Sequence, residues 1–190
     1  MARKEGILSI TPQERLFLNV SGLSAELRGV VTNVSPTLDE PATILLVEDT
    51  PDDEELALRA LRRLRASLVV KVARDGLAAL HALGLDGAQG KRRPDIVLCD
   101  LKLPKVGGDE VLRQTRAKAD LRGIPFVVFS SSDEPSDVAR CDALGASEYA
   151  VKPIDYEEYS ERVGQIVERH LASAQALQKR IPPALLPTED

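Results

Sequence analysis

Several short apolar runs of this sequence end in a side chain that can carry charge or donate a hydrogen bond. These side chains belong to Glu48, Asp49, Asp100, Ser130 and Lys152. In an open parallel sheet, ligands bind beyond the carboxyl ends of the strands. If the apolar runs are strands of such a sheet, three carboxylates, a hydroxyl and an ammonium therefore meet at one edge.

The three carboxylates of this set indicate a metal site. Two carboxylates about 4 Å apart repel each other by roughly 4 kcal/mol at an effective dielectric constant of about 20. A shared cation removes this repulsion, and carboxylate, carbonyl and water oxygens are the ligands that Mg²⁺ prefers. Glu48 and Asp49 could instead cap the following helix, but Asp52 and Asp53 already stand at its start. We therefore expect Glu48, Asp49 and Asp100 to hold Mg²⁺.

Asp100 follows a run with the character of a buried strand, so its charge is held at the edge of an apolar sheet. An aspartate can act as a nucleophile and form an aspartyl phosphate. Phosphoryl transfer mainly requires positioning and neutralisation of the phosphoryl oxygens. Lys152 can supply positive charge and Ser130 a hydrogen bond, and Pro153 fixes a turn that directs Lys152. The set predicts a phosphoacceptor site centred on Asp100.

From residue 43 onward the sequence alternates short apolar runs with helical patterns. The predicted strands occupy residues 44–47, 68–73, 96–99, 126–129 and 149–151. The predicted helices occupy residues 52–65, 76–83, 109–117 and 135–144, and a last helix begins near residue 155. Strands that are apolar throughout, each followed by a helix, are typical of a parallel sheet covered on both faces.

The absence of one motif indicates the order of the strands in this sheet. There is no Gly-rich dinucleotide fingerprint, which favours flavodoxin-like winding over a Rossmann domain. We therefore predict an α/β fold with a flavodoxin-like five-stranded parallel sheet of order 2-1-3-4-5 and helices on both faces. In this order the second strand is an edge, and the ends of the other four strands share the crevice.

The first 41 residues differ in pattern from the rest of the chain, and we interpret them as an N-terminal extension and linker. A capping box at residues 11–14, with Pro at the first helical position, predicts the start of a helix. The apolar stripe of this helix consists of Leu16, Val20, Leu23 and Leu27. We expect an N-terminal helical arm, either frayed or packed on its own domain, or else used for dimerisation or for binding a partner.

The last predicted helix has apolar residues along one side at coiled-coil-like spacing. This seam consists of Val163, Ile166, His170, Ala174 and Leu177. Such a seam is too apolar for a fully solvated helix. We therefore expect a homodimer through the last helix.

Composition excludes several classes of function. The chain has 25 Lys and Arg against 30 Asp and Glu, a formal net charge of −5, whereas a nucleic-acid-binding surface needs a clear basic excess. It has no signal-peptide pattern, no long apolar span and no paired-cysteine framework. We expect a cytoplasmic protein that binds neither nucleic acid nor membrane.

Four segments together resemble the receiver domain of two-component response regulators. They are Leu-Val-Glu-Asp at 46–49, Asp-Leu-Lys-Leu-Pro at 100–104 with Gly-Gly at 107–108, Ser-Ser-Ser at 130–132, and the run from Gly to Lys-Pro at 145–153. They occur in the family's order across about residues 42–172. One such motif is weak, but the complete set is highly specific.

The resemblance implies a histidine kinase or a histidine phosphotransfer protein that donates a phosphoryl group to Asp100. It also implies Mg²⁺ bound directly by Asp49 and Asp100, by the backbone carbonyl of Lys102, and by Glu48 through water. The first acidic residue is Glu rather than the family's commoner Asp, which lengthens the reach to the metal.

The same resemblance implies how phosphorylation is reported. Ser130 moves toward the new phosphate, and an aromatic residue of the fifth strand, here Tyr149, swings inward behind it. The peptide bond between Lys152 and Pro153 is expected to be cis. Ser at position 130, where Thr is commoner in the family, has a less restricted side chain because it is not β-branched.

We predict an extension and linker at residues 1–41, a receiver domain at 42–173 and a tail at 174–190. The extension and the tail are too small for a DNA-binding or enzymatic output domain, so output is expected through protein–protein contacts, to a downstream target that the sequence does not identify. The protein is then no enzyme in the usual sense, but a phosphoacceptor that catalyses its own phosphorylation and slow autodephosphorylation. Its details are similar to the small regulators paired with phytochrome-type kinases.

Two alternatives stay open. A Mg²⁺-dependent phosphatase of the haloacid dehalogenase type also uses an aspartate nucleophile, but there the nucleophile follows the first strand with a second Asp two residues on. Here the first strand is followed by Glu-Asp-Thr-Pro at 48–51, which does not match. A receiver that serves only as a scaffold for dimerisation would lack Asp100 or Lys152, and both are present.

Overall fold

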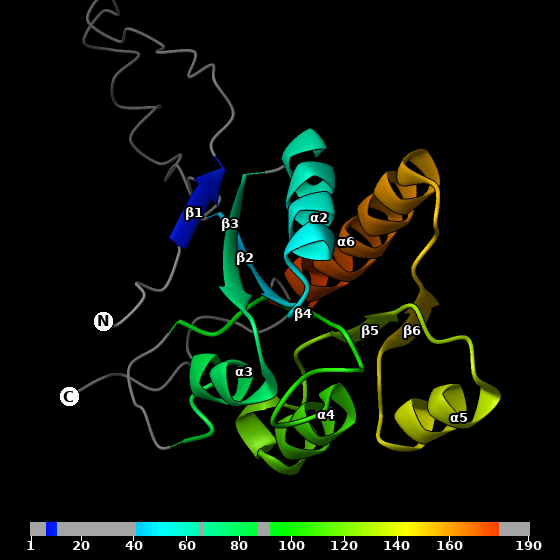
Figure 1. Cartoon of the computed structure of the whole chain (residues 1–190). Helices are drawn as coiled ribbons and strands as arrows, with labels where there is room; N and C mark the ends of the chain where they lie inside the picture. The colour runs from blue at the N-terminus through cyan, green and yellow to red at the C-terminus, as the bar shows by residue number, and fades with distance from the viewer. Residues whose placement is uncertain (1–6, 11–40, 65–66, 87–91, 179–190) are drawn as a thin grey trace, which may run out of the picture.

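The structure is a computed structural model, and it describes residues 7–10, 41–64, 67–86 and 92–178, of which 7–10 and 172–178 are described by their backbone only. Within these residues, six strands form one sheet in the order β1-β3-β2-β4-β5-β6 (Figure 1). The strands are β1 (Ile7–Ile10), β2 (Ala42–Val47), β3 (Leu68–Ala73), β4 (Ile96–Cys99), β5 (Phe126–Ser130) and β6 (Glu148–Val151). Strands β3, β2, β4, β5 and β6 are parallel, which confirms the predicted 2-1-3-4-5 order.

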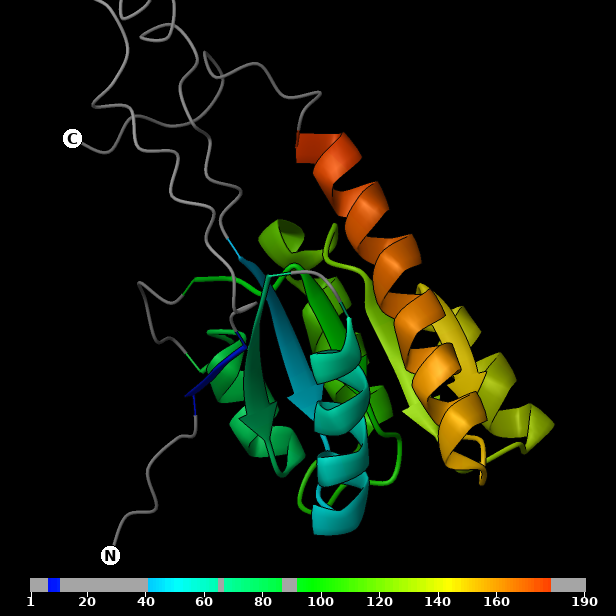
Figure 2. The ribbon, with the colours of Figure 1, turned by 90° about the horizontal axis from the view of Figure 1, so that it is seen from above.

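Helices cover both faces of the sheet. They are α2 (Pro51–Arg63), α3 (Gly76–Ala82), α4 (Gly108–Ala117), α5 (Pro135–Ala143) and α6 (Tyr156–Gln178), with a short 3₁₀ helix at Ala119–Leu121. Helices α2 and α6 lie side by side on one face, and α3, α4 and α5 lie on the other (Figures 1 and 2). Among the described helices, none is long and apolar enough to cross a membrane.

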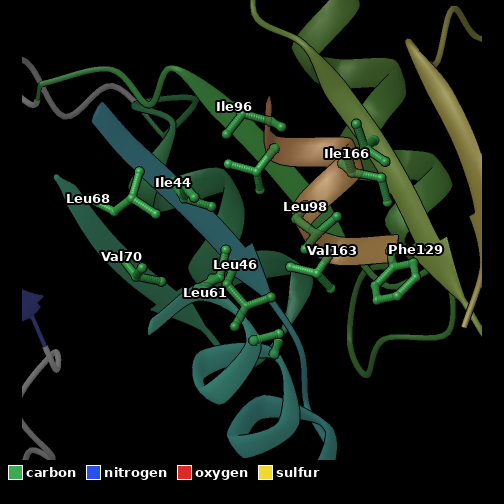
Figure 3. Packing of buried hydrophobic residues seen from close by; sticks show 14 of the residues in the cluster. Ile44, Leu46, Leu61, Leu68, Val70, Ile96, Leu98, Phe129, Val163 and Ile166 are labelled. Atoms are coloured by element: carbon green, nitrogen blue, oxygen red, sulfur yellow. The ribbon is translucent and has the colours of Figure 1, made fainter. Parts of the chain in front are cut away.

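The central strands are apolar throughout because successive side chains point to opposite faces of the sheet, and a hydrophobic core covers each face. Ile44 and Leu46 of β2 pack with α2 and α6, whereas Leu45 and Val47 pack with α3 and α4. The same alternation holds along β4 and β5, as expected for a side-chain period of two residues. Figure 3 shows the first of these cores, in which Leu61 of α2 and Ile166 of α6 meet the sheet.

Strand β1 was not predicted. It pairs antiparallel with β3, with Ile7 opposite Lys71 and Ile10 opposite Leu68. The second predicted strand is therefore covered on the side that the sequence analysis left as an edge. A segment of four residues is too short to stand out by hydrophobic periodicity. The predicted helical arm, with Leu16, Val20, Leu23 and Leu27, lies outside the described residues.

The predicted dimer seam on the last helix is wrong for the residues whose side chains the structure describes. Val163 and Ile166 are fully buried inside the domain, where they pack against β4 and β5 (Figure 3). His170 lies 2.9 Å from the carboxylate of Glu148. Ala174 and Leu177 belong to residues whose side chains are not described, so a homodimer through the last helix stays a prediction, which the solution mass with and without phosphorylation tests.

The loop between β4 and α4 follows Asp100 and is held by close backbone contacts. The N–H of Gly108 donates to the carbonyl of Leu101 at 2.9 Å. A Cβ atom at Gly108 would lie 2.1 Å from the carbonyl oxygen of Asp100, and one at Gly76 would lie 2.0 Å from that of Val106. The loop therefore packs on the start of α3 and α4 at distances that only glycine permits.

We expect Gly108→Ala to destabilise the protein by about 1–3 kcal/mol, because the added methyl group forces the backbone after Asp100 to move. Gly123→Ala is the matched control, since a Cβ atom at Gly123 meets nothing within 4 Å. Urea unfolding followed by circular dichroism measures both variants. Equal stabilities for the two would contradict the close packing of this loop.

Candidate functional site

The register of the parallel strands brings the predicted residues to one edge of the sheet. Val47 of β2 is aligned with Cys99 of β4, so Glu48 and Asp100 follow at the same level. Their backbone continues the ladder, since the N–H of Asp100 donates to the carbonyl of Val47 at 2.9 Å. The alternation along each strand places the side chains of Glu48 and Asp100 on the α2 and α6 side.

Lys152 reaches these carboxylates from the end of β6. Its Nζ lies 2.6 Å from Glu48 Oε2, 3.2 Å from Asp100 Oδ2 and 2.8 Å from Asp53 Oδ2. The Lys152 side chain is only 6% exposed, and those of Glu48 and Asp100 are 3% and 10% exposed. Such burial makes these ion pairs far less screened than surface pairs. We call Glu48, Asp53, Asp100 and Lys152 the ionic cluster.

Asp53 is a member of the cluster that the sequence analysis missed. It was assigned to the start of the following helix together with Asp52, and both do lie in the first turn of α2. Its carboxylate nevertheless points to Lys152, a residue 99 positions away in the sequence. A sequence signal for this contact does exist. Side chains alternate along a strand, so Lys152, directly after β6, lies on the sheet face that α2 covers, where the first turn of α2 can reach it.

The carboxylate of Asp100 is held in a defined orientation. Its Oδ1 accepts hydrogen bonds from the N–H of Leu101 at 2.6 Å and of Lys102 at 3.3 Å. Its Oδ2 accepts from Lys152 at 3.2 Å. On the opposite side of the chain, Cys99 donates its thiol to the Asp100 carbonyl at 3.1 Å. The Asp100 carboxylate is therefore held in one orientation by its own neighbours.

Burial and charge act in opposite directions on this cluster. Burial raises the pKa of Glu48 above its ordinary value, and the hydrogen bond from Lys152 only partly offsets this. Burial lowers the pKa of Lys152, but the charge of Asp100 and the hydrogen bonds to Asp53 and Glu48 outweigh it, so the pKa lies above the usual range. Lys152 is thus charged at neutral pH, while burial keeps the pKa of Glu48 above its ordinary value.

The residues predicted to bind Mg²⁺ fit a divalent cation. Glu48, Asp49 and Asp100 each offer a carboxylate oxygen, and these oxygens lie within 4.8 Å of one another. In the described part of the chain, three carboxylates contact the one ammonium of Lys152, and Asp49 adds a fourth carboxylate close to two of them. This excess of negative charge on hard oxygen ligands favours a cation such as Mg²⁺.

Helix capping does not explain Glu48 and Asp49. The N-cap of α2 is Thr50, and no side-chain capping hydrogen bond forms there. Glu48 accepts one bond from the N–H of Thr50 at 3.3 Å, but its other oxygen binds Lys152.

Ser130 and Tyr149, the two predicted switch residues, are joined through Ser132. Ser130 is fully buried, and its Oγ accepts from the N–H of Ser132 at 3.4 Å. Tyr149 packs on the core beside α4 and α5, and its hydroxyl donates to the Ser132 carbonyl at 2.8 Å. The carbonyl of Ser130 accepts from the backbone N–H of Lys152 at 2.8 Å. Within the described residues, the Ser130 hydroxyl makes no hydrogen bond to Asp100 or Lys152, so its contact with a phosphoryl group stays a prediction.

Two expectations about the loops have different outcomes. The peptide bond between Lys152 and Pro153 is trans, so the expected cis bond is wrong. Trans is the ordinary state of such a bond, favoured by about 0.5–1 kcal/mol. The backbone N–H of Lys102 contacts Asp100, whereas its carbonyl stays a predicted metal ligand.

The comparison with protein families agrees with this geometry. The model of the response regulator receiver domain matches residues 44–164, well over half of the 190 residues. The chain therefore belongs to the family of response regulator receiver domains. It is similar to the probable methanogenesis regulatory protein FilR2 of Methanothrix harundinacea, with 39% identity over 130 residues that cover 68% of this chain and 84% of FilR2.

Solved structures of phytochrome response regulators show the same fold. The phosphorylated cyanobacterial phytochrome response regulator RcpA has 32% identity and a TM-score of 0.66, over 70% of this chain and 96% of RcpA. The Mn²⁺-bound form of the response regulator Rcp1 has 32% identity and a TM-score of 0.63, over 78% of this chain and all of Rcp1 (100%). Rcp1 is a protein of Synechocystis.

We expect Glu48→Gln to raise the melting temperature in the presence of EDTA at pH 7, by about 2–4 °C for each kcal/mol gained. Because the pKa of Glu48 is raised in the folded state, its ionised form costs stability above the ordinary pKa of 4.5. The difference between the variant and the wild type should therefore be largest above the raised pKa of Glu48, shrink as the pH falls through it, and be lost below about 4.5. Differential scanning calorimetry across this pH range measures it.

Glu161→Gln, at an exposed position of α6, is the matched control and should change the melting temperature little at any pH. Lys152 keeps Asp53 and Asp100 as partners in Glu48→Gln, so the variant leaves no buried charge without a partner. A lower melting temperature of Glu48→Gln at pH 7 would show that the ion pair outweighs burial.

Proposed function

We propose that this protein is a cytoplasmic response regulator that accepts a phosphoryl group on Asp100 from the phosphohistidine of a histidine kinase or of a phosphotransfer protein. The observation that carries the proposal is the ionic cluster. It combines a buried, oriented aspartate with a charged lysine 3.2 Å away and with an acidic group suited to a divalent cation.

The transfer needs little from the protein beyond this arrangement. An oxygen of Asp100 attacks the phosphorus, the new P–O bond forms as the P–N bond to histidine breaks, and the imidazole leaves with the electron pair. The two backbone N–H groups on Oδ1 keep the carboxylate in place for this attack. Lys152, already hydrogen-bonded to Oδ2, stands where it can neutralise a phosphoryl oxygen. The hydroxyl of Ser130 would donate a hydrogen bond to another phosphoryl oxygen.

The residues that would hold Mg²⁺ are Glu48, Asp49, Asp100 and, through its carbonyl, Lys102. When bound, Mg²⁺ would offset the negative charge of the carboxylates and of the phosphoryl oxygens. The Mn²⁺-bound structure of Rcp1 supports a divalent cation in this family. Without such a cation, the approach of a phosphoryl donor would be opposed by the carboxylates, which the single Lys152 does not balance.

We propose that the chain acts as an acceptor and not as an enzyme with an external substrate. It would catalyse its own phosphorylation and the slow loss of the phosphoryl group. The membership of the receiver family supports this over a phosphatase, whose nucleophile would follow the first strand. The presence of both Asp100 and Lys152 in one cluster supports it over a scaffold that only dimerises.

The contacts of Ser132 suggest how the event is reported. Ser132 donates its N–H to Ser130 Oγ, accepts the Tyr149 hydroxyl at its carbonyl, and donates its own hydroxyl to Asp137 of α5 at 2.7 Å. Helix α5 has a single buried residue, Cys141, so polar contacts contribute much of what holds it. A phosphoryl group adds about −1.5 to −2 charges. We infer that movement of Ser130 shifts α5 and the surface around β6 and α6.

The relatives suggest the kind of kinase that acts on this protein. RcpA is a cyanobacterial phytochrome response regulator, and a bacteriophytochrome response regulator, RtBRR, is 39% identical with a TM-score of 0.58, over 78% of this chain and 84% of RtBRR. We propose a phytochrome-type histidine kinase as the donor, and signalling through protein–protein contacts rather than through nucleic acid or a membrane.

A phosphorylation assay tests the function. We expect the full chain to become labelled when it is incubated with radioactive acetyl phosphate and Mg²⁺, and Asp100→Asn to lose the label because it lacks the nucleophilic oxygen. Asp142→Asn, at an exposed position of α5, is the matched control and should be labelled like the wild type. Gel electrophoresis under mild conditions, which preserve acyl phosphates, measures the label.

An unlabelled wild type would contradict the receiver function, and a persistent label on Asp100→Asn would contradict the site. Rapid hydrolysis of several phosphate esters by the wild type would favour the phosphatase. EDTA should abolish labelling if a divalent cation is required.

A further inference from the structure

Lys152 has one partner that takes no part in the predicted chemistry. The ammonium has three protons, and its three close acceptors are Glu48 at 2.6 Å, Asp53 at 2.8 Å and Asp100 at 3.2 Å. Two of these acceptors, Glu48 and Asp100, also belong to the group of carboxylates that could hold a metal ion, and Asp53 does not. Lys152 and a divalent cation therefore compete for two of the same carboxylates.

Asp53 is placed to decide this competition. When a cation draws Glu48 and Asp100 to itself, Asp53 is the close partner that Lys152 keeps among the described residues. The Asp53 side chain is 33% exposed, against 3% for Glu48, so its charge is solvated at lower cost. Without it, the buried ammonium would turn entirely to the metal-binding carboxylates.

A role in starting helix α2 does not explain Asp53. A negative charge in the first turn stabilises any helix, but Asp52 and Glu54 supply the same charge in the same turn. Among the described residues, the hydrogen-bond partner of the Asp53 carboxylate is Lys152 and not a backbone N–H of the helix. Asp52 occupies the neighbouring position with an exposed side chain. The two residues share the helix and differ in their contact with Lys152.

We propose that Asp53 is a positioning residue that draws Lys152 away from Glu48 and Asp100 and thereby raises the affinity of the acidic group for Mg²⁺. The proposal rests on the proposed function, because it assumes a divalent cation at these carboxylates. After phosphorylation, Asp53 continues to hold Lys152 beside Asp100. The N–H of Lys152 that donated to Asp100 then donates to a phosphoryl oxygen instead. Asp53 thus couples the first turn of α2 to the lysine of the site.

The test measures Mg²⁺ binding to the full chain by isothermal titration calorimetry, with no phosphoryl donor present. We expect Asp53→Asn to bind Mg²⁺ on the order of tenfold more weakly than the wild type, as is usual when a partner outside the metal ligands is lost. Asp52→Asn is the matched control and should stay close to the wild type. Asp53→Glu keeps the carboxylate and should restore most of the affinity. Thermal melting in EDTA confirms that each variant is folded.

A double-mutant cycle separates action through Lys152 from a general loss of negative charge. In a Lys152→Met background, Asp53→Asn should weaken Mg²⁺ binding much less than it does in the wild type, because the competing ammonium is gone. An equal loss in both backgrounds would overturn the proposal, as would Mg²⁺ affinity in Asp53→Asn equal to that of Asp52→Asn. A wild type that binds no Mg²⁺ would instead overturn the metal site of the proposed function.

Discussion

The buried ammonium of Lys152 is the interaction on which the site depends. Three carboxylates, from the ends of two central strands and from the first turn of α2, share its three protons. An unpaired charge at this depth would cost several kcal/mol, so Lys152 and its acceptors hold one another in place. The ion pairs keep the cluster together. Because its carboxylates outnumber the ammonium, the cluster also keeps a net negative charge that favours a cation.

The rest of the fold supplies rigid support for this cluster. The central strands are packed on both faces, and their parallel register brings the ends of β2 and β4 to the same level. The loop after Asp100 is held by the close approach of Gly108 to the Asp100 carbonyl. A carboxylate on such a frame keeps its orientation without a bound ligand, which suits the phosphoryl transfer that we propose for Asp100, since that reaction depends on positioning and on neutralisation of charge.

The two faces of the sheet contribute differently. On one face, α2 and α6 bury a continuous apolar core (Figure 3). The first turn of α2 also carries Asp53 to the cluster. On the other face, α5 has Cys141 as its one buried residue and is tied by Asp137 to Ser132 and by Arg140 to Asp109 of α4, at 2.7 and 3.0 Å. An element that depends on polar contacts responds to a change of charge more readily than one that is held by burial.

The sequence by itself determined the sheet and most of the site. Apolar runs of strand length, separated by helical patterns, were sufficient to predict the five parallel strands and their order. The predicted site residues do meet at one edge of the sheet, namely Glu48, Asp49, Asp100 and Lys152. These inferences succeed because they depend on local periodicity and on a general rule for parallel sheets. The family motifs then indicated the chemistry.

Only the tertiary structure decided which apolar face is internal and which carboxylates touch Lys152. The periodicity of α6 was correctly recognised as apolar, but periodicity does not tell a core from an interface, and Val163 and Ile166 are buried in their own domain. Asp53 joined the cluster through a contact across 99 residues, which no local pattern encodes. Such contacts depend on how α2 lies across the strand ends, and that is set by packing of the whole core.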